Sequence, residues 1–225
     1  MEIRMSFDFH TVGARLDGLD SVPAGNQRGR ALEDLVIELL ESLDGVRLAE
    51  RNVVAGFMEA ELDSIWVNDD PDHGLIGFAR EVLVESKSSA DPLGSPGVTH
   101  FAEQAHKRGI PWSSIVALNG ISGDPQRANA AQQTIHDYAV RGTWIMVLVA
   151  QELRAVRSAE HLAAVIARKR IAQVGRMTAI ILTAKEIAPL DPNCGIAIRG
   201  GMEALERAIS NEEDRAINEI LDAGR

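Results

Sequence analysis

The chain has 225 residues, of which 45% are hydrophobic and 25% are charged, so it is long enough to bury one substantial core. Its single cysteine excludes a disulfide framework within the chain, and no Cys/His spacing typical of zinc surrounds it. The 33 acidic residues outnumber the 23 basic ones, and the formal net charge of -10 argues against a protein that coats nucleic acid passively.

No apolar stretch in the chain has the length of a targeting or membrane segment. The N-terminus MEIRMSFDFH lacks the apolar run of a signal peptide, and no later run approaches the ~18 apolar residues of a membrane span. We therefore expect a cytoplasmic protein that makes no contact with a membrane.

The first 45 residues divide into an irregular part and a clear helix. Residues 1–26 show no hydrophobic period, and we expect them to form a loosely attached N-terminal segment. From Gln27, leucine and valine recur at the i, i+3, i+4 spacing of an amphipathic helix, which we expect to end near Asp44-Gly45.

Three strands are expected next, and their order indicates antiparallel pairing at the front of the sheet. They cover residues 47–54, 57–67 and 80–87. Ala55-Gly56 is the expected hairpin turn between the first two strands, and the turn-forming residues of 68–77 form a loop before the third.

The second half of the chain alternates between helical and strand patterns. Helices are predicted over 98–108, 125–140 and 161–174, and strands over 114–118, 144–149 and 178–183. Together with the antiparallel front, this order predicts an α/β fold with a mixed β-sheet flanked by helices.

We expect this core to span residues 27–185. The region after it, 186–225, is predicted to be a C-terminal helical extension, with a linker within 188–201 and a Glu-rich helix over 202–223.

Charged side chains stand within the predicted strand 57–67 and at the end of the predicted strand 80–87. Side chains two residues apart in a strand share a face, so Glu61 lies on one face with Asp63, and Glu85 shares a face with Lys87. Burying a carboxylate and an ammonium is costly unless they pair or bind a metal. An isolated motif of this kind is more often a solvated strand end or a surface ion pair.

A metal centre would explain why charges occupy this place. Magnesium (Mg2+) or manganese (Mn2+) prefers oxygen ligands, which Asp63, Glu85 and the backbone carbonyl of Ser86 can supply. Such an ion polarises a phosphodiester and acidifies a bound water, and the Lys87 ammonium can orient that water or stabilise the transition state. The residues therefore predict metal-dependent phosphodiester hydrolysis.

Three motifs follow one another in the chain: Gly29-x-x-Leu32-Glu33, Glu61-Leu62-Asp63 and Val82-Leu83-Val84-Glu85-Ser86-Lys87. In this order they resemble the PD-(D/E)XK, or restriction-endonuclease-like, nuclease superfamily, in its Mrr-like or Holliday-junction-resolvase-like branch. The resemblance covers about residues 27–149, and Leu62 stands where the family pattern has a proline.

This resemblance implies a restriction-endonuclease-like fold and a DNA endonuclease that acts in defence against foreign DNA or in DNA repair. It also implies that Asp63 and Glu85 are metal ligands, that Lys87 is the catalytic lysine, and that Glu33 is an accessory acid on the first helix. The alternative for Glu33 is an ordinary glutamate favoured by the helix dipole. A homodimer is expected, because cutting both strands takes two active sites.

Two groups of polar and basic residues are further candidates. Gln104 and Lys107 lie on the helix after the Glu-x-Lys strand, where they can contact DNA or activate water, or else form a solvated helix end. Arg168-Lys169-Arg170 and Arg28-x-Arg30 can line a DNA path or form ordinary charged helix faces.

Two other classes of function compete with a DNA nuclease. A catalytically inactive nuclease-fold protein that binds DNA or serves as a scaffold would suit the acidic charge and the 4% aromatic content. An enzyme acting on RNA or on a small phosphorylated molecule ranks lower, because no RNA-recognition motif is present. The chain also has no P-loop and no GxSxG motif.

Overall fold

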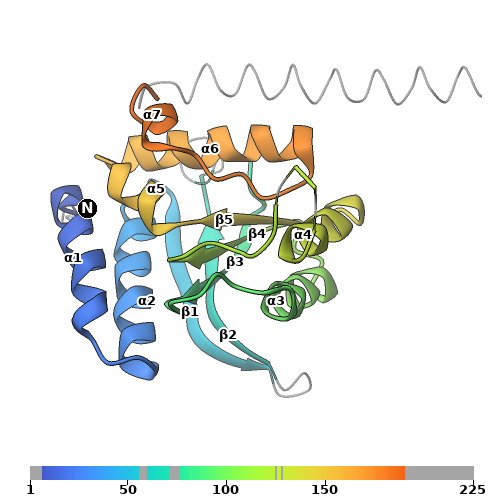
Figure 1. Cartoon of the computed structure of the whole chain (residues 1–225), viewed down its shortest axis with the longest axis horizontal. Coiled ribbons are helices and arrows are strands. Elements are labelled where there is room, and N and C mark those ends of the chain that lie inside the picture. The colour runs from blue at the N-terminus through green and yellow to red at the C-terminus, as the bar shows by residue number, and fades with distance from the viewer. Residues whose placement is uncertain are drawn as a thin grey trace, which may run out of the picture.

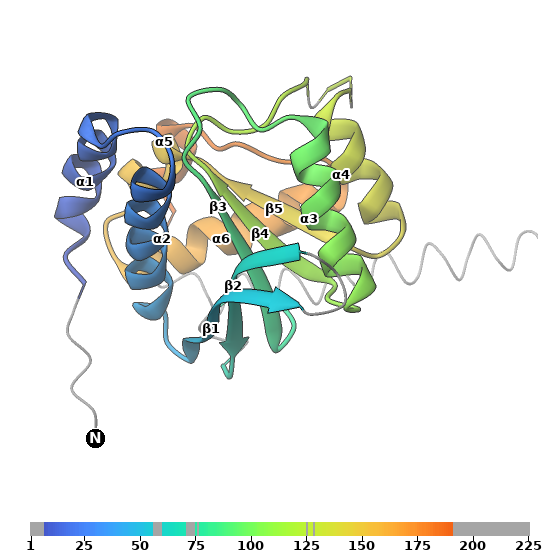
Figure 2. The same ribbon diagram turned by 90° about the horizontal axis from the view of Figure 1, so that it is seen from below.

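The chain folds around one five-stranded sheet with helices on both faces (Figures 1 and 2). The computed structural model describes residues 7–55, 60–70, 75, 77–124, 126–127 and 129–190. The α/β prediction of a mixed sheet flanked by helices is therefore confirmed. In the described part of the chain, no helix is both long and apolar enough to cross a membrane.

The strands lie side by side in the order in which they occur in the chain. They are β1 (Val46–Ala55), β2 (Ala60–Asn68), β3 (Glu81–Lys87), β4 (Trp112–Ala117) and β5 (Trp144–Leu148). β1, β2 and β3 pair antiparallel, whereas β3, β4 and β5 pair parallel. The carboxyl ends of the three parallel strands therefore meet at one edge of the sheet.

Each face of the sheet packs against its own helices. Helices α2 (Asn26–Glu41) and α6 (Ala159–Arg176) cover one face and bury Val82 and Val84 of β3. Helices α3 (Ser95–Lys107) and α4 (Ala131–Val140) cover the other and bury Leu83. This alternation along β3 follows from the period-two geometry of a strand.

The N-terminal segment is part of the folded body, so the prediction of loose attachment is wrong for its described residues. Helix α1 (Val12–Gly18) and the 3-10 turns before it (Phe9–Thr11) and after it (Leu19–Ser21) pack beside α2 (Figure 1). Val12, Leu16 and Leu19 are buried in the same core as α2. Seven residues give α1 only two helical turns, too few for a readable hydrophobic period.

Helix α4 begins at Ala131, six residues later than the predicted helix over 125–140. Asn129 holds the preceding segment in a turn, because its side chain accepts a 2.8 Å hydrogen bond from the Asp124 N–H. Its backbone carbonyl then accepts from the Gln132 N–H at 3.1 Å and starts the helix.

The predicted strand over 178–183 is wrong, since no strand occurs among these residues, all of which the structure describes. Two of their N–H groups bond to side chains instead of to a neighbouring strand. The Ala179 N–H donates to Gln132 Oε1 at 2.9 Å, and the Leu182 N–H donates to Glu152 Oε1 at 2.7 Å.

Two short helices that the sequence did not predict flank this segment in space. They are α5 (Ala150–Ala155) and α7 (Ala184–Ile187). The hairpin turn at Ala55-Gly56 lies only partly within the described residues. The helix predicted over 202–223 and most of the predicted linker lie outside them, and both stay predictions.

Candidate functional site

Asp63 and Glu85 lie close together on neighbouring antiparallel strands. The last pair of the β2–β3 register is Ser64 with Val84, and Asp63 directly precedes Ser64 while Glu85 directly follows Val84. Asp63 Oδ2 accepts a 2.7 Å hydrogen bond from the Ser86 N–H, which ties the end of β2 to β3. The Asp63 charge also raises the pKa of the Glu85 carboxyl, so the two carboxylates lie close together.

Lys87 completes this group, which we call the acid–lysine group (Asp63, Glu85 and Lys87). The Lys87 Nζ forms an ion pair with Glu85 Oε1. The Glu85 side chain is 11% exposed and the Lys87 side chain is 37% exposed, so the pair runs from the buried strand toward solvent. The predicted convergence of these three side chains at the end of β3 agrees with this geometry.

The electrostatics of the group show more negative than positive charge. Burial and then the nearby Asp63 charge raise the pKa of the Glu85 carboxyl, despite its ion pair with Lys87. Burial lowers the pKa of the Lys87 ammonium, but the surrounding carboxylates raise it by more, so the net shift is upward. Lys87 therefore keeps its charge at neutral pH, and the Asp63–Glu85 pair is stabilised by any further cation.

Glu33 on α2 lies close enough to contribute to the field at Lys87, whose pKa its charge helps to raise. Its Oε2 accepts from Arg51 Nη2 at 2.8 Å and from Arg51 Nε at 3.1 Å. Arg51, on β1, also bonds to Asp34. The sequence had suggested Glu33 but not Arg51, because only the β1–α2 contact brings these residues together.

The donor set suits a hard cation that keeps most of its own ligands. Among residues that the structure describes, no group of three or more His, Cys, Asp or Glu side chains is arranged to hold a metal. Mg2+ is usually held by one or two carboxylates, with water and substrate phosphates completing the shell. Asp63 and Glu85 supply the two carboxylates of such a site. They do not form a site in which protein ligands enclose the ion completely. The Ser86 carbonyl as a third ligand stays a prediction.

The two auxiliary candidates on α3 are not linked to the acid–lysine group. Gln104 is buried, and both its side-chain and its backbone oxygen accept from Arg108 Nη1. Lys107 is exposed and forms a 3.6 Å ion pair with Glu103. In the described part of the chain, no hydrogen bond or ion pair joins either residue to Asp63, Glu85 or Lys87.

The three basic residues Arg168, Lys169 and Arg170 of α6 lie in three different environments. Lys169 is fully buried and bonds to both oxygens of Glu152, at 2.5 and 2.6 Å. The Arg170 guanidinium lies over the Trp112 ring, 4.9 Å from its centroid, whereas Arg168 is exposed. The three residues therefore form no common basic surface.

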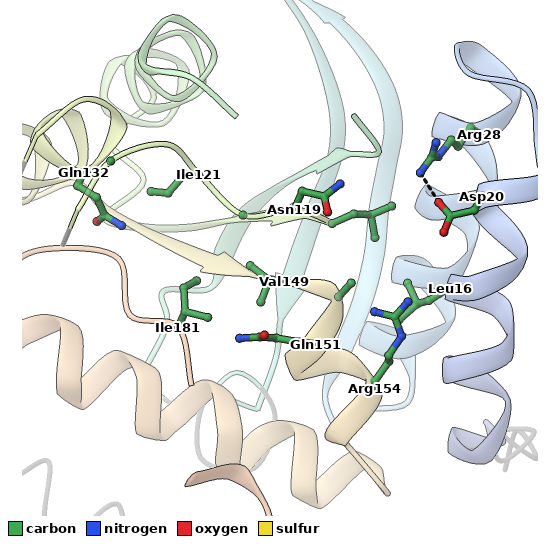
Figure 3. A pocket seen from close by; sticks show the side chains of 14 residues that line it. Leu16, Asp20, Arg28, Asn119, Ile121, Gln132, Val149, Gln151, Arg154 and Ile181 are labelled. Carbon is green, nitrogen blue, oxygen red and sulfur yellow. Dashed lines mark hydrogen bonds and ion pairs between the residues drawn. The ribbon is translucent and has the colours of Figure 1, made fainter. Parts of the chain in front are cut away.

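A cleft of about 480 Å³ lies at the carboxyl ends of β4 and β5 (Figure 3). Leu118, directly after β4, and Val149, directly after β5, line it, as does Arg28 of α2. The Leu118 N–H donates to the Lys87 carbonyl at 3.0 Å, so the cleft begins one strand away from the acid–lysine group. Ligands of open α/β sheets commonly bind at this edge. The segments that directly follow the parallel strands are therefore the sequence signal for such a cleft.

In comparisons with known proteins, no protein-family model, no curated protein and no solved structure matches the chain. The resemblance to PD-(D/E)XK nucleases therefore stays a prediction from the sequence motifs.

Proposed function

We propose that the chain is a metal-dependent nuclease that hydrolyses phosphodiester bonds in DNA at the acid–lysine group. The observation that carries the proposal is the closeness of Asp63 to Glu85, with Lys87 ion-paired beside them at the end of β3. Two adjacent carboxylates whose charges repel each other form a place where a cation is favoured.

In this proposal, Asp63 and Glu85 hold Mg2+ or Mn2+, and Ser86 adds its carbonyl oxygen. The ion supplies Lewis-acid polarisation of the phosphodiester and an acidified water. Lys87 remains charged, and its ammonium donates hydrogen bonds to a phosphate oxygen or to the attacking water. Glu33 is the accessory acid on the α2 side; its charge helps to raise the pKa of Lys87, and Arg51 holds its carboxylate in place.

The test is cleavage of plasmid, linear and single-stranded DNA with Mg2+, with Mn2+ and with a chelator. Wild-type protein should cut only with a metal, and Lys87→Ala should lose that cutting while its circular dichroism spectrum is unchanged. Lys185→Ala is the matched control, because Lys185 is exposed on α7 and belongs to no part of the site. Equal cutting by wild type and Lys87→Ala would refute the proposal.

A second candidate is a catalytically inactive protein of the same architecture that binds DNA or serves as a scaffold. It is favoured by the ion pair of Lys87 with Glu85, which already neutralises one carboxylate, and by the net charge of -10. Calorimetric titration separates the two functions: a nuclease binds Mn2+ at a site that Asp63→Asn weakens, whereas the inactive protein shows no such site.

The same proposal includes DNA as the substrate, a role in defence or repair, and action as a homodimer. The dimer is tested by light scattering of the purified chain with and without a DNA duplex. A 24.4 kDa species without DNA, together with one chain per duplex in the complex, would exclude the dimer.

A further inference from the structure

The cleft beyond β4 and β5 has two chemically different ends (Figure 3). At one end, Arg28 and Arg154 approach from α2 and α5, with Asp20 beside Arg28. At the other end, Ile121 and Ile181 supply apolar surface, and Gln132 supplies an amide. Asn119, Val149 and Gln151 lie between the two ends.

The charged end retains capacity for an anion. The Arg28 side chain is only 14% exposed, and its Nη2 donates to Asp20 at 2.8 Å, whereas its buried Nε has no hydrogen-bond partner within the described structure. Asp20 is 77% exposed, and an exposed carboxylate holds a guanidinium weakly. A phosphate can therefore bond to donors that Asp20 leaves free.

The charges of the lining also favour an anion. Within the described residues, both arginines of the lining are held only by exposed carboxylates. Arg28 pairs with Asp20, and Arg154 pairs outside the cleft with Asp17 at 2.7 Å, where the Asp17 side chain is 70% exposed. Exposed ion pairs are weak, so an anionic ligand can replace these aspartates on the guanidinium groups.

The apolar walls are held in place from behind by one buried carboxylate. Glu152 accepts from the Val149 N–H at 3.1 Å and from the Leu182 N–H at 2.7 Å, while the buried Lys169 neutralises it. Gln132 Oε1 accepts from the Ala179 N–H, which fixes the orientation of its NH2 group. A cleft with walls fixed in this way loses little entropy when a ligand binds.

We infer that this cleft binds a nucleotide, with its phosphate on Arg28 and Arg154 and its base between Ile121, Val149 and Ile181. In the described part of the chain, the Gln132 NH2 group remains a donor, because only its Oε1 is used within the protein, and Asn119 Oδ1 remains an acceptor, because only its NH2 group donates to the Ser89 carbonyl. A donor and an acceptor are what the edge of a base requires. The volume of about 480 Å³ is within the range of small-ligand sites. This inference goes beyond the proposed cleavage, because it depends on the cleft lining alone and needs no metal.

Two kinds of ligand can place a nucleotide in the cleft: a free mononucleotide and the end of a DNA strand. Full-length protein in a chelator is titrated by calorimetry with dAMP and TMP, with a 5′-phosphorylated oligothymidine, and with inorganic phosphate. Saturable binding of a mononucleotide, at least about tenfold tighter than that of phosphate, is expected. Tighter binding of the oligonucleotide than of TMP identifies a strand end as the source, and equal binding identifies the free nucleotide.

Two variants locate the binding in the cleft. Arg28→Gln should weaken nucleotide binding about tenfold or more, because it removes a charged donor to the phosphate. Gln151→Glu should do the same by adding a negative charge at an exposed position, where, among the described contacts, it removes only a long hydrogen bond to the Leu182 carbonyl, at 3.5 Å. Arg127→Gln is the matched control, since Arg127 is exposed and lies outside the lining.

Three results would overturn the inference: no saturable nucleotide binding, binding no tighter than that of phosphate, or equal affinity for wild type and both variants. Since the titrations contain no metal and measure no cleavage, they decide this point whether or not the chain proves to be a nuclease.

Discussion

Two Lys–Glu ion pairs of this protein use the same residue types in opposite ways. The Lys169–Glu152 pair is 1% and 0% exposed, and the two oxygens of Glu152 also accept two backbone N–H groups. The Lys87–Glu85 pair lies at the end of β3, where Lys87 reaches solvent and Asp63 adds a second carboxylate. The first pair is fully satisfied by the protein itself, whereas the second leaves excess negative charge.

The pKa shifts of the two lysines express this difference. Burial outweighs Glu152 and lowers the pKa of Lys169, whereas the carboxylates around Lys87 outweigh its partial burial and raise its pKa. A buried, saturated pair serves the fold, and a half-exposed, unbalanced pair remains able to bind a ligand.

Lys169→Met should produce the largest effect on stability, because it leaves the Glu152 carboxylate buried without its cation. We expect the free energy of unfolding to fall by about 3–5 kcal/mol. Urea denaturation measures it, with Arg168→Met as the exposed neighbour whose loss should matter little. A decrease below about 1 kcal/mol, as for an exposed pair, would contradict the role of this pair in stability.

Lys87→Ala should have the opposite profile, with a large effect on activity and a small one on stability. Metal-dependent DNA cleavage should fall about 100-fold or more, because a charge aimed at the reacting phosphate is lost. The free energy of unfolding should change by less than about 1 kcal/mol, as for other partly exposed ion pairs. Single-turnover cleavage and urea denaturation of the same preparation measure both; a variant that unfolds without losing activity per folded molecule contradicts the comparison.

Mg2+ should stabilise the native state through the acid–lysine group and not through Lys169–Glu152. At about 100 times its dissociation constant, an ion that binds only the folded chain adds about 2.7 kcal/mol. Thermal melting of wild type should therefore shift upward with Mg2+, and that of Asp63→Asn should not. An equal shift in both proteins would place the metal elsewhere.

Asp63→Asn should also change how stability depends on pH. The pKa of Glu85 is raised in the folded state, so the folded chain binds its proton more tightly and stability falls as pH rises from the ordinary glutamate range through the folded pKa. Removing the Asp63 charge lowers that pKa and makes the decrease smaller, while an asparagine oxygen can still accept from the Ser86 N–H.

The effect of Asp63→Asn is expected to be the smallest of the four, under about 1 kcal/mol. Urea denaturation at a series of pH values measures it. Identical pH profiles for wild type and Asp63→Asn would show that the two carboxylates do not interact.

Local patterns in the sequence were sufficient to predict most of the strands and helices of the fold. Period-two and continuous apolar runs predicted all five strands, and the i, i+3, i+4 pattern predicted α2, because each of these signals lies within one element. The same period-two rule placed Glu85 and Lys87 on one face at the end of β3, which is the part of the candidate site that depends on local geometry alone.

Other features depended on contacts between residues far apart in the chain. The segment 178–183 has the composition of a strand, yet two of its N–H groups bond to the side chains of Gln132 and Glu152. In the sequence, Lys169 is one of three consecutive basic residues, with Arg168 and Arg170. Only its ion pair with Glu152 in the folded chain shows that it is the buried one.

The sequence by itself determined the α/β class, the five strands in their order along the chain, and the candidate chemistry of Asp63, Glu85 and Lys87. Only the tertiary structure decided which lysine has all its charge paired within the protein, that α1 belongs to the core, and that Arg28 and Arg154 line a common cleft. The physical reason is that periodicity reports which face of an element is buried, whereas pairing of charges depends on which elements meet.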